Sequence, residues 1–302
     1  MTFYAFSGAV EQGLVYGIMA LGVYITFRVL DFPDLTVDGS LPLGAAVSSV
    51  CIVSGWPPFL ALLPAMGAGF LAGMVTGFLT TKLRILHLLA SILTMTALYS
   101  VNIRVMGDRP NIALIGQPTV FELLARLNLP PYLTSNLVFF VVAALIVGGL
   151  IWLMRTEFGQ ALLATGDNPR MITSLGVNTH FTIILGVGLS NSLVALSGAL
   201  VAQNQGAADV SMGVGTIVAG LASIVVGETL LNSRKTQVRV LAVLLGSIVY
   251  RVAIALALSL KFRNFSFTPS DLNLITAALV VLALVMPRLK TALAETRRIG
   301  HA

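Results

Sequence analysis

The sequence predicts an all-α, polytopic membrane helical bundle with about nine transmembrane segments. Of its 302 residues, 57% are hydrophobic and 10% are charged, and the mean hydropathy is +0.93. A soluble domain is nearer half apolar and a quarter charged. The apolar runs recur at about 20 residues, the length that crosses a bilayer as a helix, and not as the alternating ten-residue units of a barrel. We expect one membrane domain over residues 1–302.

The spans follow from apolar runs that end at charges or at glycine and proline clusters. The second run is short and has Pro42 close to its start, so we expect a broken or half-helix near 31–54. The longest polar connection, 107–133, is expected to be an external loop with a short amphipathic helix around Phe121–Leu127. The nine predicted spans lie at about 8–30, 41–54, 58–80, 85–106, 134–154, 181–204, 213–231, 240–260 and 272–288.

The basic residues predict the orientation. The net charge of +6 and the pI near 9.8 would suggest nucleic-acid binding in a soluble protein, but here the basic residues punctuate apolar spans, so no nucleic-acid partner is expected. If loop 155–180 is cytoplasmic, the other side receives only Arg104, Arg109, Arg126, Lys261 and Arg263. This predicts an external N-terminus and a cytoplasmic C-terminus. We expect the first span to be retained, because the N-terminal stretch lacks the basic leader of a signal peptide and contains Glu11. The basic residues then predicted on the cytoplasmic side are Arg28, Lys82, Arg84, Arg155, Arg170, Arg234, Lys235, Arg239, Arg288, Lys290, Arg297 and Arg298.

Several chemistries are excluded or disfavoured by the residues present. Cys51 is the only cysteine, which excludes intrachain disulfides and thiolate metal clusters. The chain contains no GxxxxGK[ST] phosphate loop, so ATP would have to be hydrolysed by another polypeptide. No His/Asp/Ser or metal constellation indicates an intramembrane enzyme, and we expect no catalytic residue, metal or cofactor in this chain.

The stretch DFPDLTVDGS, residues 31–40, places three acids between two apolar segments. A carboxylate at membrane depth normally has a partner, a cavity or a functional role. In a structural interpretation, Pro33 breaks the helix, Thr36, Asp38 and Ser40 cap the next segment, and Arg28 pairs with an acid. In a functional interpretation, Asp34 or Asp38 lines the transport pathway and contacts a solute amine.

Several other polar residues can also be interpreted either as structural contacts or as part of the transport pathway. Asn191 lies in mid-span, so it either bonds to another helix or faces the pathway. Tyr99 and Asn102 are placed to face an outer vestibule, and Asn204 belongs to a wet external rim or to a site. Glu228, followed by Arg234, Lys235 and Arg239, is expected to be a buried ion pair or helix-end anchor, with proton coupling as the alternative. The pathway candidates are Asp34, Asp38, Asn102, Asn191 and Asn204.

Loop 155–180 is too long for a plain turn. Asn168 can cap a helix, Pro169 suits its first turn, and Gly176 suits a left-handed stop. Met171, Ile172 and Leu175 would give this short surface helix an apolar face. It is either a docking element or a packed amphipathic connector.

A resemblance makes the docking interpretation specific. The order FG, ALLATGDNP and SLGVN is similar to the coupling loop of ABC-importer permeases of the branched-chain amino acid and ribose type. DLTVDGS with PLGAAV, and GLASIVVGETLLNS, resemble two further elements of that family, with Glu228 where a glycine is usual. The resemblance runs from Gly13 to Pro287 and implies these coupling residues: Phe158, Gly159, Gly166, Asn168, Pro169, Met171, Ile172, Leu175 and Gly176.

The resemblance also implies a function. Such a permease moves a small polar solute by alternating access, in the bacterial inner membrane, as a dimer with two nucleotide-binding subunits that hold ATP and Mg²⁺, and with an external solute-binding protein. The wider match is close to a subfamily that works with lipoprotein-like binding proteins and includes candidates for aromatic amino acid uptake, so a homodimer and an amino acid are favoured. The alternative is an ion-gradient-driven secondary transporter that couples through Asp34, Asp38 and Glu228.

Overall fold

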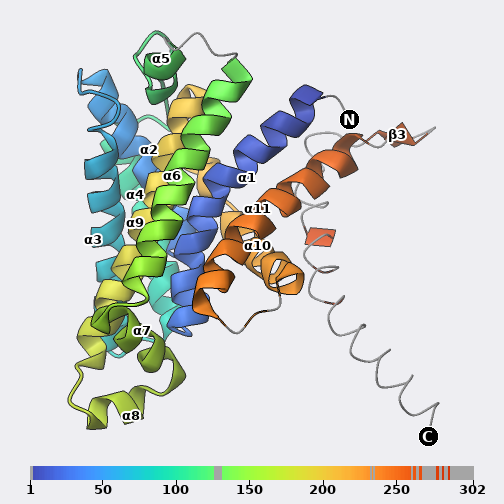
Figure 1. Ribbon diagram of the computed structural model, residues 1–302. Coiled ribbons are helices and arrows are strands. Elements are labelled where there is room, and N and C mark those ends of the chain that lie inside the picture. The colour runs from blue at the N-terminus through green and yellow to red at the C-terminus, as the bar shows by residue number, and fades with distance from the viewer. Residues whose placement is uncertain are drawn as a thin grey trace, which may run out of the picture.

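The computed structural model describes residues 3–125, 131–231, 233, 235–259, 261–262, 265–266, 277–278, 281 and 285. Within these residues, seven helices are long and apolar enough to cross a membrane, and an eighth apolar helix is shorter. They form a bundle in which α1 and α11 are tilted relative to α3 and α6 (Figure 1). The eight are α1 Phe3–Tyr24, which continues as the π-helical turn η1 Ile25–Val29, α2 Val37–Val53, α3 Leu62–Thr81, α4 His87–Val105, α6 Pro131–Leu153, α9 Thr179–Gln205, α10 Thr216–Leu230 and α11 Thr236–Ser259.

The prediction of a helical membrane bundle is confirmed. Eight of the nine predicted spans overlap these helices, with ends that differ by a few residues. The second predicted span begins at Val37 and not at residue 41, and Pro42 lies inside the helix. The ninth, 272–288, lies outside the described residues except at 277–278, 281 and 285, so the count of about nine is not confirmed.

Helices α1 and α9 form the centre of the bundle. α2 and α3 pack on α9, α10 and α11 pack on α1, and α4 packs on α2 and α3. The helices approach closely at glycines: a Cβ at Gly44 would lie 2.0 Å from the carbonyl oxygen of Ala195, and a Cβ at Gly198 would lie 2.0 Å from that of Leu41. Small residues permit this packing without side-chain intrusion.

The central packing also accounts for Arg251, which falls inside a span. Its guanidinium carbon lies 3.8 Å from the centroid of the Tyr16 ring, a cation–π contact between α11 and α1.

Short elements close the two ends of the bundle. At one end lie α5 Val120–Ala125 and an antiparallel pair of strands, β1 Asn111–Ala113 with β2 Ala207–Asp209. Helix α5 overlaps the short helix predicted around Phe121–Leu127, of which residues 126–127 lie outside the described residues. The turn η2 Val210–Gly213 leads from β2 into α10. At the opposite end lie α7 Glu157–Asp167 and α8 Pro169–Ser174 (Figure 1). The described part of the chain contains four short strands, which include the pair β3 Lys261–Phe262 and β4 Phe265–Ser266 and are a small departure from the all-α prediction.

Candidate functional site

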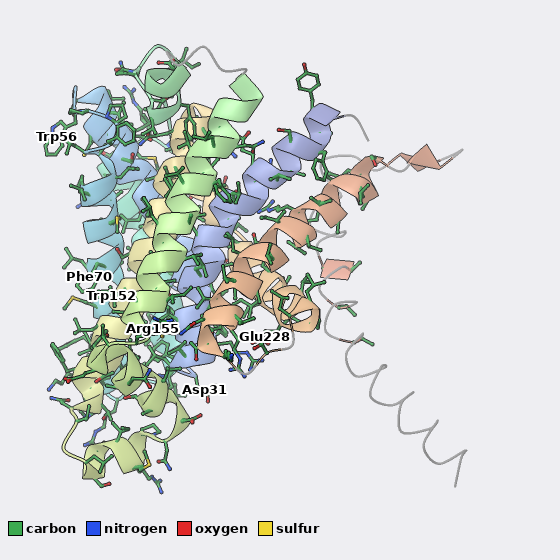
Figure 2. All side chains as sticks on the ribbon, in the orientation of Figure 1. Asp31, Trp56, Phe70, Trp152, Arg155 and Glu228 are labelled. Atoms are coloured by element: carbon green, nitrogen blue, oxygen red, sulfur yellow. The ribbon has the colours of Figure 1, made fainter. Side chains whose placement is uncertain are left out.

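The first helix ends in an irregular segment at the end of the bundle where α7 and α8 lie. Asp31 has a left-handed backbone with φ of 50°, and Phe32 precedes Pro33, which disfavours helical geometry at Phe32. The chain then enters α2 at Val37. Figure 2 shows Asp31 at this end of the bundle and Trp56 at the other, so α2 carries the chain back through the bundle. The predicted interruption near Pro33 is confirmed.

Asp34 and Asn191 join this interruption to α9. Both side chains are fully buried, and Nδ2 of Asn191 donates to Oδ2 of Asp34 at 2.7 Å. The other Asp34 oxygen accepts the Thr36 amide at 2.9 Å, while Oδ1 of Asn191 accepts the hydroxyl of Ser40 at 2.7 Å. The hydroxyl of Thr36 meets that of Thr76 in α3 at 2.8 Å. Of the two interpretations of Asn191, the structure shows the bond between helices.

Asp38 caps a helix that is distant in sequence. Its Oδ1 accepts the amide of Ile217 at 2.9 Å and the hydroxyl of Thr216 at 3.0 Å, and its Oδ2 accepts the amide of Gly215 at 3.1 Å. A carboxylate at a helix N-terminus satisfies free amides and interacts favourably with the helix dipole. Asp38 therefore holds the start of α10 against the first turn of α2.

Two local predictions for this stretch are wrong. Thr36 is the N-cap residue of α2 but makes no side-chain cap, and Asp38 and Ser40 bond to other helices, so none of the three caps α2. Arg28 does not pair with a neighbouring acid, because its partner is Glu228 in α10. Each of these side chains bonds to a residue of another helix, and the local sequence does not reveal which helices are neighbours.

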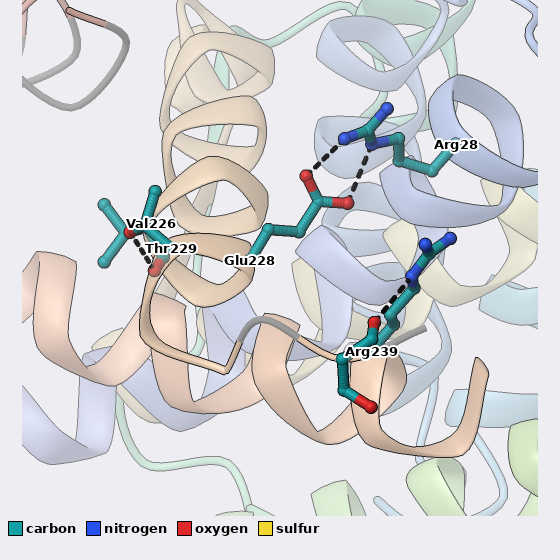
Figure 3. Close-up of polar contacts among 6 residues, drawn as sticks. Arg28, Val226, Glu228, Thr229 and Arg239 are labelled. Carbon is teal, nitrogen blue, oxygen red and sulfur yellow. Dashed lines mark hydrogen bonds and ion pairs between the residues drawn. The ribbon is translucent and has the colours of Figure 1, made fainter. Parts of the chain in front are cut away.

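The ion pair between Arg28 and Glu228 links η1 to α10 (Figure 3). Both guanidinium donors Nε and Nη2 of Arg28 reach the carboxylate, while Arg239 donates to the backbone oxygen of Ser233 at 3.1 Å. The expectation of an ion pair at Glu228 holds, but the side chains of Arg28 and Glu228 are 57% and 21% exposed, so the pair is not buried.

A cavity of about 330 Å³ opens between α2, α4 and η2. Of the predicted pathway residues, Asp38 and Asn102 line it, together with Tyr99, whereas Asp34, Asn191 and Asn204 do not. Asn204 lies near the C-terminal end of α9, where its side-chain amide donates to the carboxylate of Glu11 in α1. The structure therefore separates the five candidates into a pair that lines the cavity (Asp38 and Asn102), a buried junction (Asp34 and Asn191) and a contact between α9 and α1 (Asn204).

Helices α7 and α8 follow from capping residues. Thr156 accepts the amide of Gly159 at 3.2 Å and starts α7, and Asn168 accepts the amide of Met171 at 3.1 Å and starts α8. Gly176 ends this segment with a left-handed φ of 88°. The predicted cap at Asn168, first turn at Pro169 and stop at Gly176 are confirmed. Helix α7 was missed, although Thr156 before a short helix-forming run is a signal for it.

The apolar residues predicted on α8 divide between two environments. Ile172 is buried at 6% exposure and anchors the helix, whereas Met171 and Leu175 are 49% and 70% exposed. Exposed apolar side chains at the tip of a protruding helix are typical of contact surfaces, where a partner would remove them from water.

Close contacts join α7 to the bundle. A Cβ at Gly166 would lie 2.0 Å from the carbonyl oxygen of Val29 in η1, and a Cβ at Gly159 would lie 2.1 Å from that of Leu153 in α6. Phe158 packs against the main hydrophobic core. A cavity of about 590 Å³ between η1, α7 and α11 is lined by Arg28, Asp31, Asp167 and Arg239 among others, so the surroundings of this joint are charged.

Residues 5–286 match the family described as the permease component of the branched-chain amino acid transport system. The chain belongs to this family. Its apolar helices and its relatives agree in making it a multi-pass transport permease of the membrane.

Individual relatives give finer comparisons. The chain is 40% identical to a tyrosine transport system permease protein of Clostridioides difficile (strain R20291), over 94% of this chain and 92% of the relative. It is 28% identical to the ribose import permease protein RbsC of Bacillus subtilis (strain 168), over 62% of this chain and 56% of the relative. Among solved structures, PsaBC from Streptococcus pneumoniae in complex with Fab matches with a TM-score of 0.52 and 16% identity, over 94% of this chain and 91% of that one, which shows a shared fold.

Proposed function

We propose that this protein is the transmembrane subunit of an ATP-driven ABC importer that carries an amino acid into a bacterial cell by alternating access. The observation that carries the proposal is the α7–α8 element, which is well capped, presents exposed apolar side chains at its tip and is joined tightly to η1. A nucleotide-binding subunit that contacts Met171 and Leu175 would displace α8 together with α7. The close contact at Gly166 would then displace η1 and the helix α1 that it continues.

The proposal assigns roles to the predicted residues. Asp38 and Asn102 belong to the transport pathway, Asp34 and Asn191 hold the interrupted helix, and Asn204 lies at the outer rim. The coupling element consists of Phe158, Gly159, Gly166, Asn168, Pro169, Met171, Ile172, Leu175 and Gly176.

The proposed assembly contains two copies of this permease, two nucleotide-binding subunits with ATP and Mg²⁺, and an external solute-binding protein. The α7–α8 end is assigned to the cytoplasm of the bacterium, with the N-terminus external and the C-terminus cytoplasmic. Basic residues support this orientation, since Arg170 lies in α8 and Arg28, Arg155, Lys235 and Arg239 line cavities beside α7. The relative named as a tyrosine permease supports an amino acid as the solute.

The test is uptake of L-tyrosine and L-phenylalanine into cells that carry the permease, its ATPase and its binding protein. Depletion of ATP with the ion gradients maintained should abolish uptake, and collapse of the gradients by an ionophore with ATP maintained should leave it. The opposite pattern would establish the alternative, an ion-gradient-driven secondary transporter. Failure of the permease to co-purify with any ATPase would also count against the proposal.

A further inference from the structure

A cavity of about 400 Å³ lies where α6 ends and α11 begins. Arg155 lines it just after α6, Lys235 lines it just before α11, and Gln160 of α7 also contributes. Both α6 and α11 are long and apolar enough to cross the membrane. Because the cavity lies at the ends of two such helices, we place it at the boundary between the bilayer and water.

The wall of this cavity carries two positive charges without a counter-charge. The side chains of Arg155 and Lys235 form no ion pair or hydrogen bond with the described residues, and no aspartate or glutamate of the described chain lines the cavity. The cavity between η1, α7 and α11 differs, because Asp31 and Asp167 line it beside its arginines. Two like charges at one cavity repel each other, and an anion between them would be stabilised by both.

The start of α11 adds hydrogen-bond donors to the same wall. Thr236 and Gln237 line the cavity and are the first two residues of α11, where backbone amides lack helical acceptors. The helix dipole also favours negative charge at this end. Guanidinium, ammonium and amide donors together suit the oxygens of a phosphate group.

Apolar surface continues from the cavity along α11. Leu241, Leu245 and Val249 follow Gln237 at intervals of four residues, so they lie on the same face of the helix, and they are 44%, 46% and 44% exposed. This row leads from the charged cavity toward the middle of the span.

A matching row leads along α6. Ile151 lines the cavity, and Gly148, Ala144 and Val141 precede it at helical spacing and are exposed. A Cβ at Gly148 would meet nothing within 4 Å, so the surface here has room for a chain of methylene groups. Helices α6 and α11 contact each other, which keeps the two rows close to the same cavity.

We infer that this cavity binds the phosphate headgroup of an anionic phospholipid, whose acyl chains lie against the apolar rows of α6 and α11. A soluble anion or an acidic protein segment would use the two charges but not the apolar rows, whereas a lipid uses both. Basic pockets between membrane helices are typical sites for such headgroups. The bound phosphate would offset the repulsion between Arg155 and Lys235 and hold the end of α6 to the start of α11.

Quenching of tryptophan fluorescence by brominated lipids tests this site. Trp56 and Trp152 are the only tryptophans of the chain, so Trp56→Phe with Trp152→Phe gives a silent background. Leu241→Trp in this background reports on the row beside the cavity. Val75→Trp is the matched control, because Val75 is 51% exposed, lies about as far from the same end of the bundle on α3, and does not line the cavity.

The full-length permease is placed in phosphatidylcholine liposomes that contain a fixed minority of phosphatidylglycerol. Bromine is carried, near the headgroup end of an acyl chain, either by the phosphatidylglycerol or by an equal share of the phosphatidylcholine. Brominated phosphatidylglycerol should quench Leu241→Trp about five-fold more than brominated phosphatidylcholine does. For Val75→Trp the two lipids should quench about equally.

Charge variants make the result specific to the cavity. Arg155→Gln combined with Lys235→Gln should abolish the preference for phosphatidylglycerol at Leu241→Trp, while Arg155→Lys should retain most of it. Lys82→Gln is the matched control, since exposed Lys82 follows α3 at the same end of the bundle and lies outside the cavity. The preference should survive in Lys82→Gln.

Three results would overturn the inference. One is equal quenching of Leu241→Trp by the two lipids, and another is an equal preference at Val75→Trp, which would indicate general attraction to the charged surface. The third is loss of the preference on addition of glycerol phosphate or of the ATPase, which would assign the cavity to a soluble phosphate or to a protein partner. The ATPase's own fluorescence is subtracted with the tryptophan-free permease. The inference does not depend on ATP-driven transport, because it needs only a permease in a membrane.

Discussion

Gly166 of α7 lies directly against the backbone of Val29 in η1, so closely that a Cβ at Gly166 would lie 2.0 Å from the carbonyl oxygen of Val29. Backbone-to-backbone contact leaves no flexible side chain between the two segments. A displacement of α7 must therefore shift η1 or break the contact. Since η1 continues α1, which forms the centre of the bundle with α9, this contact is a direct physical route between the α7–α8 element and the membrane helices.

Gly176→Val should impair assembly with the ATPase while membrane insertion remains normal. Valine is strongly disfavoured at the left-handed φ of 88°, so the segment after α8 should change its path and displace Leu175. Gly55→Val is the matched control, because Gly55 has φ of 87° in the connection between α2 and α3. Co-purification of the ATPase should fall for Gly176→Val and stay near normal for Gly55→Val; equal recovery with both variants would contradict the proposed role of α8.

Asn191→Leu should lower the stability of the bundle severely. It leaves Oδ2 of the buried Asp34 and the hydroxyl of the buried Ser40 without their partner, and the loss of such a network costs roughly 2–5 kcal/mol. Ser40→Ala removes one bond of the same network and should cost about 1 kcal/mol. Thermal unfolding in detergent and the yield of folded protein measure the stability of both variants. A fully stable Asn191→Leu variant would show that the junction of Asp34, Ser40 and Asn191 contributes little to the stability of the fold.

Asp38 variants should weaken the start of α10 in a graded order. Asp38→Ala removes all three accepted hydrogen bonds and should cost about 1–2 kcal/mol, the usual effect of losing a helix cap. Asp38→Asn keeps one side-chain oxygen that can accept from Ile217 and Thr216, so we expect a smaller loss of stability than for Asp38→Ala. If the folded yield of Asp38→Asn is normal but uptake disappears, the carboxylate acts on the solute directly and its capping role is secondary.

Glu228→Gln should leave uptake within about two-fold of the native rate. Because Arg28 is 57% exposed, solvent screens the ion pair and its contribution to the free energy of unfolding should stay below about 1 kcal/mol. Salt should weaken it further. A proton-coupled transporter would instead lose coupled uptake in this variant, so the pH dependence of uptake by Glu228→Gln and native protein distinguishes the two mechanisms.

The sequence was sufficient for features that depend on neighbouring residues. Apolar length predicted the spans, Pro33 predicted the interrupted helix, and Asn168, Pro169 and Gly176 predicted both ends of α8. Each of these signals acts within one or two helical turns, so it can be read without knowing which helices meet. The predicted roles of these residues in coupling and transport stay predictions.

Long-range partners could not be predicted in the same way. Asp38 caps α10 across 177 to 179 residues, and Arg28 meets Glu228 across 200 residues. Locally, Asp38 resembles a cap for the helix that contains it, and Asp31 and Asp34 are the obvious partners for Arg28. The packing of α10 beside α1 and α2 decides otherwise, and packing of this kind is a property of the tertiary structure.

The most direct test of the proposed coupling is the transport ratio, the number of solute molecules taken up for each ATP that the ATPase hydrolyses. It is measured for the Gly166→Ala permease in proteoliposomes that also contain the ATPase and the loaded binding protein. Gly149→Ala is the control, because a Cβ at Gly149 in α6 meets nothing within 4 Å. We predict that Gly166→Ala retains at least about half of the ATP hydrolysis but loses about ten-fold in solute per ATP, as a lost transmission step requires. An unchanged ratio in Gly166→Ala, equal to that of Gly149→Ala, would contradict transmission through this contact.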